Sequence, residues 1–580
     1  METTVASVSA TRNPLAADPP TGSDPPTPPP TRGAGDPTSI DLPDLHCKLP
    51  TALTAMSTLL PVDRDEPDSA STLSMPPSTL DLLVLTFNCA KNLINPGVFA
   101  THLASAFGQN ATGLPDLVVF QAFIGDYFLN PYVARFDEAI NLAALRHDGE
   151  ADERQRLQDV VSVTPTEESA STGKRYTLVR AHNVGYTAIL LFAKDPNRVR
   201  DLQEAEVGFG AAEMGNKGAV GLRALYDAGK GDGAHSTELT FVATHLAAME
   251  WNLPRRNANW AAIMRGLTFD NPEAVVQRMR SREGTSPAGS SSEEDEDGEE
   301  SERHRLLHDD HHRRHLELQR QLHDISVFKP SSHLFVAGDL NYRISTVSPT
   351  PNSAFPSLDP ASEQYYPTFF PLDQLTRERT AGRTMHGLTE HEVRFPPTYK
   401  YDVQGGSSQD DDGMPGAEAV PWKFAPHRYP SWTDRVLYLD LPPWVRASSE
   451  APQMRVREYD ALPVVRTSDH RAVFLRVDVP LIPPAQLAPP ETRSPLKKGD
   501  SGVDEDGDVA GTTAAIMATD PRVRLPVEID PEAWERRKAA RQKERLVGWS
   551  MFLWSTREGA LVLATLLVAG VGGYWLYKSA

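Results

Sequence analysis

Short apolar runs, each about the length of a β-strand, recur along the middle of the chain and set its predicted secondary structure. They cover residues 81–90, 116–121, 186–194, 217–226, 238–246, 333–341, 434–441 and 471–479. Longer stretches with helix-compatible patterns lie between several of them, such as residues 131–145 and 254–267. Many short strands with interspersed helices are typical of an α/β or α+β sandwich. We therefore predict a single core that spans residues 79–480.

Segments of a different composition flank and interrupt this core. Residues 1–78 and 481–531 are rich in Pro and small polar residues, a composition that cannot easily build a core, so we expect both to be disordered. The block at about residues 283–318 begins with Ser and acidic residues and continues as a polar stretch rich in His and Arg. We interpret it as an exposed, charged insertion that contains a polar surface helix.

The overall charge narrows the class of partner. The formal net charge is −20, from 58 Lys and Arg against 78 Asp and Glu. Because general nucleic-acid binders carry a basic face, we expect no nucleic-acid partner, although a local basic pocket is compatible with this charge. There are 2 cysteines, Cys47 and Cys89, which argues against a disulfide framework and favours a reducing compartment.

The C-terminal end carries an uncharged apolar run, residues 559–577, close to the roughly 20 residues that a helix needs to cross a bilayer. A basic segment, residues 532–557, precedes this run. Basic residues flank the cytosolic side of a span, so we predict a single-pass tail anchor with the rest of the chain in the cytosol. The short run suits a thin membrane such as the endoplasmic reticulum, with mitochondria as the alternative. The other interpretation is a helix buried in a soluble core.

Polar side chains stand at the tips of five of the apolar runs. They are Asn88, His245, Asp339 with Asn341, Asp434, and Asp469 with His470. A single Asp, Asn or His at a strand tip is usually a turn or cap residue. Because five tips carry such residues together, we expect them to form one functional site.

Two of these residues are candidate metal ligands. Asn88 and Asp469 offer amide and carboxylate oxygens, which are the ligands that Mg²⁺ prefers. Mg²⁺ also keeps several waters, which leaves coordination positions for a substrate phosphate. We therefore predict Mg²⁺ as the cofactor.

The other tip residues suit the hydrolysis of a phosphate ester. Asp339 can take a proton from an attacking water, and Asn341 can donate a hydrogen bond to a phosphoryl oxygen. His470 can neutralise the charge that develops on the phosphate while Asp434 orients its imidazole. These roles together predict a phosphatase or a related hydrolase.

Six motifs give the chain a family resemblance. They are GNKGAV (residues 215–220), THLAAMEWNLPRRN (244–257), GDLNYR (338–343), FPPTYKY (395–401), PSWTDRVL (430–437) and TSDH (467–470). Over residues 80–480 the chain resembles the inositol polyphosphate 5-phosphatases of the DNase I-like endonuclease/exonuclease/phosphatase superfamily, and it looks most like their fungal tail-anchored members. The resemblance implies a four-layer α/β sandwich of two packed sheets flanked by helices.

The resemblance also implies residue roles. His245 is a further contact to the phosphate that is cleaved. Tyr399, Lys400 and Arg428 look like the cluster that binds the 4-phosphate beside the 5-phosphate, since an arginine fork and a lysine ammonium suit phosphate oxygens. Lys217 adds positive potential. The simpler interpretation of each cation is an ordinary surface residue.

The chain departs from the family pattern at the run of residues 116–121. In the family this strand ends in Gln-Glu, and the Glu is a principal Mg²⁺ ligand, whereas this chain continues from Gln121 to Ala122 and Phe123. Asp126 or Glu138 are the candidates to replace the carboxylate. Two explanations stay open: a mispredicted or alternatively spliced coding sequence of an active enzyme, or a pseudophosphatase that binds phosphoinositide without hydrolysing it.

The expected function is the Mg²⁺-dependent removal of the 5-phosphate from phosphatidylinositol 4,5-bisphosphate, and from related inositol polyphosphates, by a monomer at a cytosolic membrane surface. The first alternative is the phosphoinositide-binding pseudophosphatase. The second is a nuclease or sphingomyelinase of the same superfamily, which the net charge and the PSWTDR and TYKY motifs disfavour.

Overall fold

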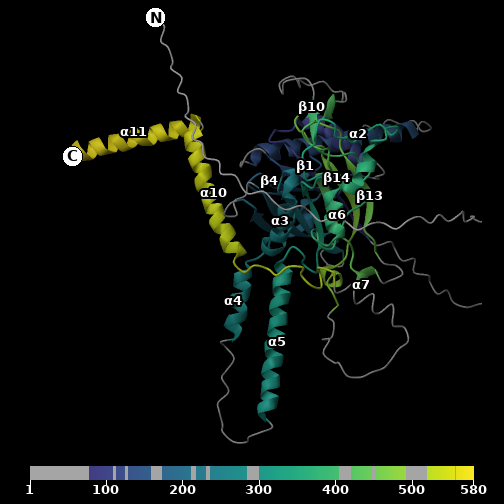
Figure 1. Ribbon diagram of the computed structural model, residues 1–580. Helices are drawn as coiled ribbons and strands as arrows, with labels where there is room; N and C mark the ends of the chain where they lie inside the picture. Colours follow the sequence, from purple (N-terminus) through teal and green to yellow (C-terminus); the bar gives the residue numbers. More distant parts are fainter. Residues whose placement is uncertain are drawn as a thin grey trace, which may run out of the picture. The chain divides into compact units, whose positions relative to one another are not determined.

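The computed structural model contains two six-stranded β-sheets, and each of the eight predicted apolar runs coincides with one of their strands (Figure 1). The other four strands, Thr177–Val184, Val199–Gly208, Leu388–Thr389 and Arg455–Ala461, were missed. The structure describes residues 78–108, 113–124, 129–158, 173–210, 217–229, 235–283, 299–403, 420–446, 452–490, 519–555 and 557–579. The predicted N-terminal tail thus lies outside the described residues, apart from its last residue.

The first sheet has the order β13 (Arg455–Ala461), β14 (Val473–Pro480), β1 (Thr79–Asn88), β2 (Leu117–Phe123), β4 (Thr187–Ala193) and β3 (Thr177–Val184). The second has the order β5 (Val199–Gly208), β6 (Gly218–Asp227), β7 (Ser236–His245), β8 (His333–Asp339), β12 (Asp434–Leu439) and β9 (Leu388–Thr389). Each sheet holds one parallel pair, β1 with β2 and β7 with β8, and the other pairs are antiparallel. A separate hairpin pairs β10 (Tyr401–Val403) with β11 (Trp422–Phe424).

Helices lie between the strands in the chain. The longer ones are α1 (Pro96–Gly108), α2 (Asn130–Gln158), α3 (Leu253–Gly266), α4 (Pro272–Glu283), α5 (Glu299–Ile325), α10 (Ala533–Ser555) and α11 (Arg557–Ser579). The short ones are α6 (Gln374–Thr380), α7 (Pro443–Arg446) and α8 (Pro484–Leu487), with 3₁₀ turns at η1 (Pro196–Arg198), η3 (Glu250–Asn252) and η4 (Tyr366–Leu372).

Three apolar layers hold the sandwich together. The central layer joins the facing sides of the two sheets and includes Val84 and Val119 of the first sheet and Leu222 and Phe241 of the second. A second layer packs α1 and α2 on the outer side of the first sheet, and a third packs α3 on the outer side of the second sheet. The order helix, sheet, sheet, helix confirms the predicted four-layer DNase I-like sandwich.

The predicted insertion at about residues 283–318 coincides with the end of α4 and most of α5. Residues 284–298, its Ser and acidic run, lie outside the described residues. The predicted polar surface helix is α5, in which residues 312–316 are exposed.

The structure differs from the predicted disordered linker at both of its ends. Ile482 and Leu487 are buried against Leu441. Farther along, Arg522 is 1% exposed, and its guanidinium donates hydrogen bonds to the carbonyls of Leu439 and Asp440. The prediction failed because an arginine in a Pro- and Asp-containing stretch gives no apolar pattern, although its guanidinium can satisfy buried carbonyls. The middle of the linker, residues 491–518, lies outside the described residues.

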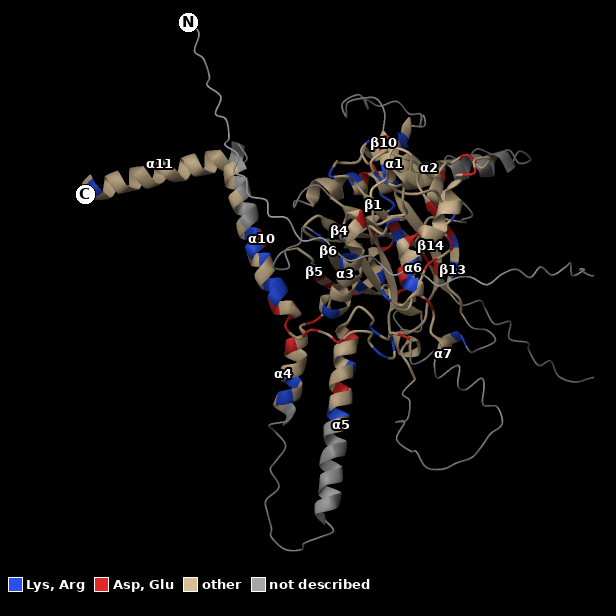
Figure 2. Cartoon of the chain, in the orientation of Figure 1, with Lys and Arg blue, Asp and Glu red and all other residues tan. Residues whose placement is uncertain are grey.

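The basic segment before the apolar run forms most of α10, whose Lys and Arg are blue in Figure 2. Part of it docks on the second sheet, because Arg537 pairs with Glu206 of β5 at 3.0 Å. Arg537 also pairs with Glu544 of α10 itself at 2.8 Å. The apolar run itself is α11, and residues Gly559–Ser579 are long and apolar enough to cross a membrane, with a mean hydropathy of 1.8. Only 6% of the most apolar 18-residue stretch of α11 is buried, so α11 is a candidate membrane anchor and not a core helix.

Candidate active site

The ends of strands from both sheets meet at the place where the predicted polar tips lie. Asn88 ends β1, His245 ends β7 and Asp339 ends β8. His245 is the partner of Asp339 in the parallel β7–β8 pair, and Asp434, the first residue of β12, is its antiparallel partner. Strand register therefore brings together side chains that are far apart in the sequence.

His470, which precedes β14, is held by a buried carboxylate. Its Nδ1 lies 2.8 Å from Oδ2 of Asp434, and the same oxygen accepts hydrogen bonds from the hydroxyls of Thr398 and Thr433, each at 2.8 Å. Burial would lower the pKa of His470, but the carboxylates of Asp434 and Asp339 outweigh it and raise that pKa. Burial raises the pKa of Asp434. The pair thus orients the imidazole and favours its cationic form.

Asp339 is the second buried carboxylate of the site. Its Oδ2 accepts a hydrogen bond from Nδ2 of Asn88 at 2.9 Å and lies 3.2 Å from Nε2 of His245. Burial would raise its pKa, but His245, His470 and Lys217 outweigh burial and hold the pKa of Asp339 well below its usual range. Asp339 is therefore ionised at neutral pH, as a proton acceptor must be.

Asn341 is buried beside Asp339, and its side chain already has partners within the protein. Its Nδ2 donates to the carbonyl of Leu246 at 3.2 Å, and its Oδ1 accepts a hydrogen bond from Arg343. Its backbone N–H donates to Oδ1 of Asp339 at 3.2 Å. Its φ of 58° lies in the left-handed region, which Asn adopts more readily than most residues. Asn341 supports Asp339, and its hydrogen bond to a phosphoryl oxygen stays a prediction.

The two predicted metal ligands both lie beside His470. Its Nε2 is 3.2 Å from Nδ2 of Asn88 and 3.9 Å from Oδ1 of Asp469. The amide oxygen of Asn88 accepts the backbone N–H of Ala90 at 2.9 Å, so Asn88 turns its nitrogen toward the site. Oδ2 of Asp469 accepts a hydrogen bond from Lys400 at 2.6 Å. A metal ion at this position requires the Asn88 amide to turn round.

The end of β2 lacks a carboxylate. Phe123 is the parallel partner of Asn88, and its ring packs edge-on against His245 with 4.2 Å between the ring centroids. Ala122, which follows Gln121, lies in the apolar layer beneath α1 and α2. An aromatic ring therefore stands beside Asn88, and the strand end carries no ligand carboxylate, as its sequence predicts.

Neither predicted substitute for the missing carboxylate is seen at the site. Asp126 lies outside the described residues. Glu138 is on α2, where its exposed carboxylate lies 3.9 Å from Arg135. Substitution by Glu138 is therefore excluded in this arrangement.

The residues present fit a divalent cation in part. Asp339, Asp434 and His470 each have a potential ligand atom, and these three atoms lie within 4.8 Å of one another. Within the described part of the chain, Oδ1 of Asp434 is buried without a hydrogen-bond partner. The oxygens of Asp339 and Asp434 suit Mg²⁺, whereas His470 binds no metal in its cationic form. With one carboxylate fewer than the family pattern, we expect weaker binding.

Tyr399 and Lys400 lie directly at the site. The Tyr399 ring is 4.4 Å from the His470 ring between centroids, and the guanidinium of Arg343 lies 4.3 Å from the Tyr399 centroid. Burial would lower the pKa of Lys400, but the hydrogen bond to Asp469 and the charges of Tyr399 and Asp469 together outweigh burial and raise that pKa. These contacts form a cationic rim around His470.

Arg428 completes this rim from another loop. Its guanidinium lies 3.3 Å from Oε1 of Glu250 and 3.4 Å from the hydroxyl of Ser348. Arg428 Nη2 also lies 3.9 Å from Sδ of Met249. A phosphate that bound Arg428 would compete with Glu250 for the guanidinium.

Lys217 lies deeper in the site than a surface cation. Its ammonium contacts Nε2 of His245 and lies 5.8 Å from the centroid of the Phe123 ring. Burial lowers the pKa of Lys217 to about 8. Burial and the Lys217 charge together lower the pKa of His245 to about 4. Lys217 thus contacts His245 and lowers its pKa. The contact of Lys217 with substrate stays a prediction.

Comparison with known proteins identifies the family. Residues 85–476 match the model of the endonuclease/exonuclease/phosphatase family 2, which is more than half of the chain. The chain belongs to this family. The resemblance predicted from the six motifs is thereby confirmed.

Curated relatives of this endonuclease/exonuclease/phosphatase chain include inositol polyphosphate 5-phosphatases. Type II inositol polyphosphate 5-phosphatase 15 of Arabidopsis thaliana is 29% identical over 281 residues, which are 47% of this chain and 21% of the relative. Synaptojanin-1 of Rattus norvegicus is 25% identical over 365 residues, which are 59% of this chain and 18% of the relative. The matched part is thus about a fifth of the length of these relatives.

A solved structure is also similar. The inositol polyphosphate 5-phosphatase domain of SPsynaptojanin is 18% identical, and the match covers 69% of this chain and 84% of that chain with a TM-score of 0.41. At this TM-score we draw no conclusion from the likeness.

Three residues of the site were missed in the sequence, although each lies inside a motif of this family. Arg343 ends GDLNYR and binds Asn341, while Thr398 of FPPTYKY and Thr433 of PSWTDRVL bind Asp434. Their positions beside the tip residues were the available signal. Their roles depend on contacts across strands, which no single motif shows.

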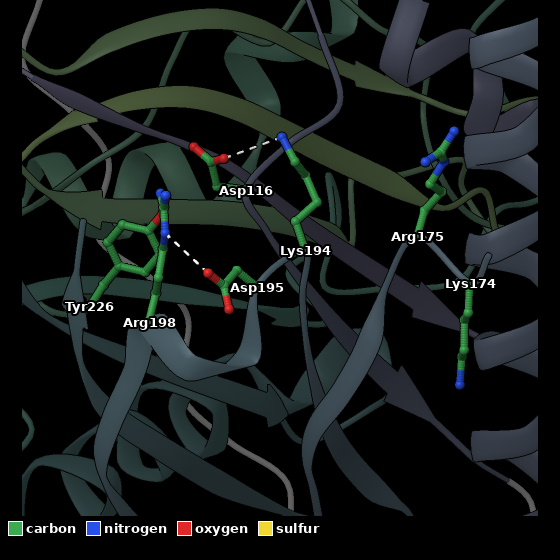
Figure 3. Close-up of a pocket in the computed structure, with 7 residues that line it drawn as sticks. All are labelled: Asp116, Lys174, Arg175, Lys194, Asp195, Arg198 and Tyr226. Atoms are coloured by element: carbon green, nitrogen blue, oxygen red, sulfur yellow. Dashed lines mark hydrogen bonds and ion pairs between the residues drawn. The ribbon is translucent and has the colours of Figure 1, made fainter. Parts of the chain in front are cut away.

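A second charged pocket is lined by residues near the ends of β2, β3, β4 and β6 (Figure 3). It is lined by Asp116, Lys174, Arg175, Lys194, Asp195, Arg198 and Tyr226. Lys194 pairs with Asp116, and Arg198 pairs with Asp195, each at 3.4 Å. Lys174 and Arg175 also have carboxylate partners, at 2.8 Å each. Because acids neutralise its cations, this pocket has little excess charge for an anionic ligand.

Proposed function

We propose that the chain hydrolyses the 5-phosphate of phosphatidylinositol 4,5-bisphosphate, and of related inositol polyphosphates, at a cytosolic membrane surface. The observation that carries the proposal is the buried cluster of His470, Asp434 and Asp339 at converging strand ends. The relatives named as inositol polyphosphate 5-phosphatases support the choice of substrate class.

In the proposed reaction a water oxygen attacks the 5-phosphorus and the inositol 5-oxygen leaves. Asp339, held ionised by its cationic neighbours, accepts the proton of the water. His470, kept cationic by Asp434, stabilises the negative charge that develops on the phosphoryl oxygens. On the other side of Asp339, the Lys217 ammonium extends this positive field, and the neutral His245 lies between the two groups.

We propose Mg²⁺ as the cofactor, held by Asn88 and Asp469 beside His470. When bound, it would neutralise phosphate charge. Asn88 has to turn its amide oxygen inward, and Asp469 has to share its carboxylate with Lys400. The strength of Mg²⁺ binding therefore depends on the free-energy cost of these two changes at Asn88 and Asp469.

The cationic rim is proposed to select the neighbouring 4-phosphate. Lys400 and Arg428 currently bind the carboxylates of Asp469 and Glu250, and Tyr399 packs on His470. A phosphate offers more oxygens than a carboxylate, so it can replace these partners. A tail anchor at α11 would hold this rim near its lipid substrate and raise the effective substrate concentration.

The test is phosphate release from vesicles that contain phosphatidylinositol 4,5-bisphosphate, in Mg²⁺. Phosphatidylinositol 4-phosphate, which lacks the 5-phosphate, is the matched substrate control. Asp339→Asn should lower kcat by about 10²- to 10⁴-fold, the range for loss of a general base. Equal release from both lipids, or an undiminished Asp339→Asn variant, would refute the assignment.

Phe123 favours one second candidate, a pseudophosphatase that binds phosphoinositide without hydrolysis. Its ring stands beside Asn88 and His245, where a ligand carboxylate is missing. Phe123→Glu puts a carboxylate at this place, and Phe123→Leu is the matched apolar control. Restoration of a Gln-Glu end by Ala122→Glu is less suitable because Ala122 is buried in the apolar layer. If only Phe123→Glu releases phosphate while the parent chain binds the lipid, the second candidate is correct.

A further inference from the structure

A small cavity, lined in part by Asp339, lies between the two sheets. Among its lining residues are Thr86, Gln121 and Thr187 of the first sheet and Thr244, His245 and Asp339 of the second. It leaves about 10 Å³ of room for a water molecule, close to the minimum that one water needs. The cavity is therefore large enough for one small polar species and no larger ligand.

Three of the lining residues carry buried polar atoms without a hydrogen-bond partner in the described part of the chain. They are Oε1 of Gln121, Oγ1 of Thr187 and Nδ1 of His245. The three residues are 4%, 1% and 5% exposed. An unpaired buried polar group destabilises the fold, so three around one cavity call for a shared partner.

The orientation of Gln121 is fixed by its other end. Its Nε2 donates a hydrogen bond to the carbonyl of Thr244 at 2.9 Å, which requires that the unpaired atom is the oxygen. Gln121 is also the register partner of Thr86, so its side chain points between the sheets. An oxygen acceptor, a hydroxyl and an imidazole nitrogen thus line the same cavity.

A water molecule suits this set better than a cation. Water can donate to the Gln121 oxygen, and it can donate to or accept from the Thr187 hydroxyl and the His245 nitrogen in either tautomer. The ammonium of Lys217 contacts the other nitrogen of His245, and a cation in the cavity would be repelled by it. Three hydrogen bonds are also the usual number for a buried water.

We infer that one buried water molecule occupies this cavity and that Gln121 and Thr187, acting through it, position the His245–Asp339 pair. Gln121 and Thr187 are therefore positioning residues. The kinetic part of this inference rests on the proposed phosphatase function, whereas the water itself does not.

The first test is the electron density of the full chain in detergent. We expect a peak within hydrogen-bond distance of Gln121 Oε1, Thr187 Oγ1 and His245 Nδ1, and we expect its loss in Thr187→Val. An empty cavity would overturn the inference. A peak that gives an anomalous signal after Mn²⁺ replaces Mg²⁺ would also overturn it, because the occupant would then be a cation.

The second test separates positioning from general stability. Thr187→Val should lower kcat by about tenfold, with KM within about twofold, as is typical when a residue behind a catalytic group is lost. The matched control is Thr237→Val, which removes another buried, unpaired hydroxyl from the far end of β7. Rescue by Thr187→Ser supports the role of the hydroxyl, and equal loss in both valine variants would overturn it. If the parent chain releases no phosphate, the proposed function fails while the density test still decides the water.

Discussion

Asp434→Asn tests whether the buried pair with His470 drives catalysis. Asp434 is fully buried, and its Oδ2 binds the His470 ring at 2.8 Å and the hydroxyls of Thr398 and Thr433. Asn keeps the shape and one oxygen but removes the charge. At the observed separation, two unit charges in a medium of effective dielectric about 20 attract by about 6 kcal/mol.

The expected loss is smaller than this attraction because burial already penalises both ions. We therefore expect kcat to fall between about 10²- and 10⁴-fold, the range for a displaced acid or base. The pKa of His470 is raised by Asp434, so the variant should lose the imidazolium at lower pH. The high-pH limb of activity should move to lower pH, with KM nearly unchanged.

The assay is kcat and KM for short-chain phosphatidylinositol 4,5-bisphosphate from pH 5 to 9. Asp478→Asn is the matched control, since Asp478 is a mostly buried aspartate of β14 that pairs with Arg457 outside the site. A folded Asp434→Asn variant with kcat within threefold of the parent, or with the same pH profile, would show that the pair does not drive catalysis. If the parent is inactive, NMR titration of His470 measures the same coupling.

Three further predictions concern stability and location. Arg522→Met should lower the free energy of unfolding by about 2–4 kcal/mol in urea because it strands the carbonyls of Leu439 and Asp440, whereas exposed Arg524→Met should change little. His333 is buried, and burial with the Arg522 charge lowers its pKa to about 3 from 6.5. Between pH 6.5 and 5 the His333 imidazole takes up a proton in the unfolded chain but not in the folded one, so acid favours unfolding. The free energy of unfolding of the parent should therefore fall by about 2 kcal/mol over this range, and that of His333→Gln should fall by less. Deletion of residues 557–580 should release the chain from membranes in sedimentation, and unchanged sedimentation would refute the anchor.

Much of the fold could be predicted because eight of the twelve strands of the two sheets have their own apolar signal. The other four, β3, β5, β9 and β13, were missed because they are short or carry many polar residues. The run HLFVAGD became β8, and its polar end placed Asp339 at the site before any contact was known. The motif residues around it also converged, as His245, Asp434 and His470 show. Local pattern and motif order thus predicted the architecture and the centre of the site.

The remainder depends on contacts between distant segments. No local signal shows that Lys217 would contact His245 and would not join the cationic rim. Likewise, none shows that Phe123 would lie beside Asn88. The buried docking of Arg522 was hidden for the same reason, since its partners are backbone carbonyls. Every residue has a backbone carbonyl, so the sequence does not indicate which carbonyls Arg522 contacts.

The docked C-terminal segment determines what a longer linker could change. The chain packs on the domain at Leu487 and contacts it again at Arg522, so the described residues on both sides of 491–518 are fixed to the domain. If α11 is the proposed membrane anchor, the distance from the site to the bilayer depends on α10, which contacts β5 through Arg537, and not on the number of residues between 491 and 518. A shorter or longer α10 should then change which lipids the proposed phosphatase reaches.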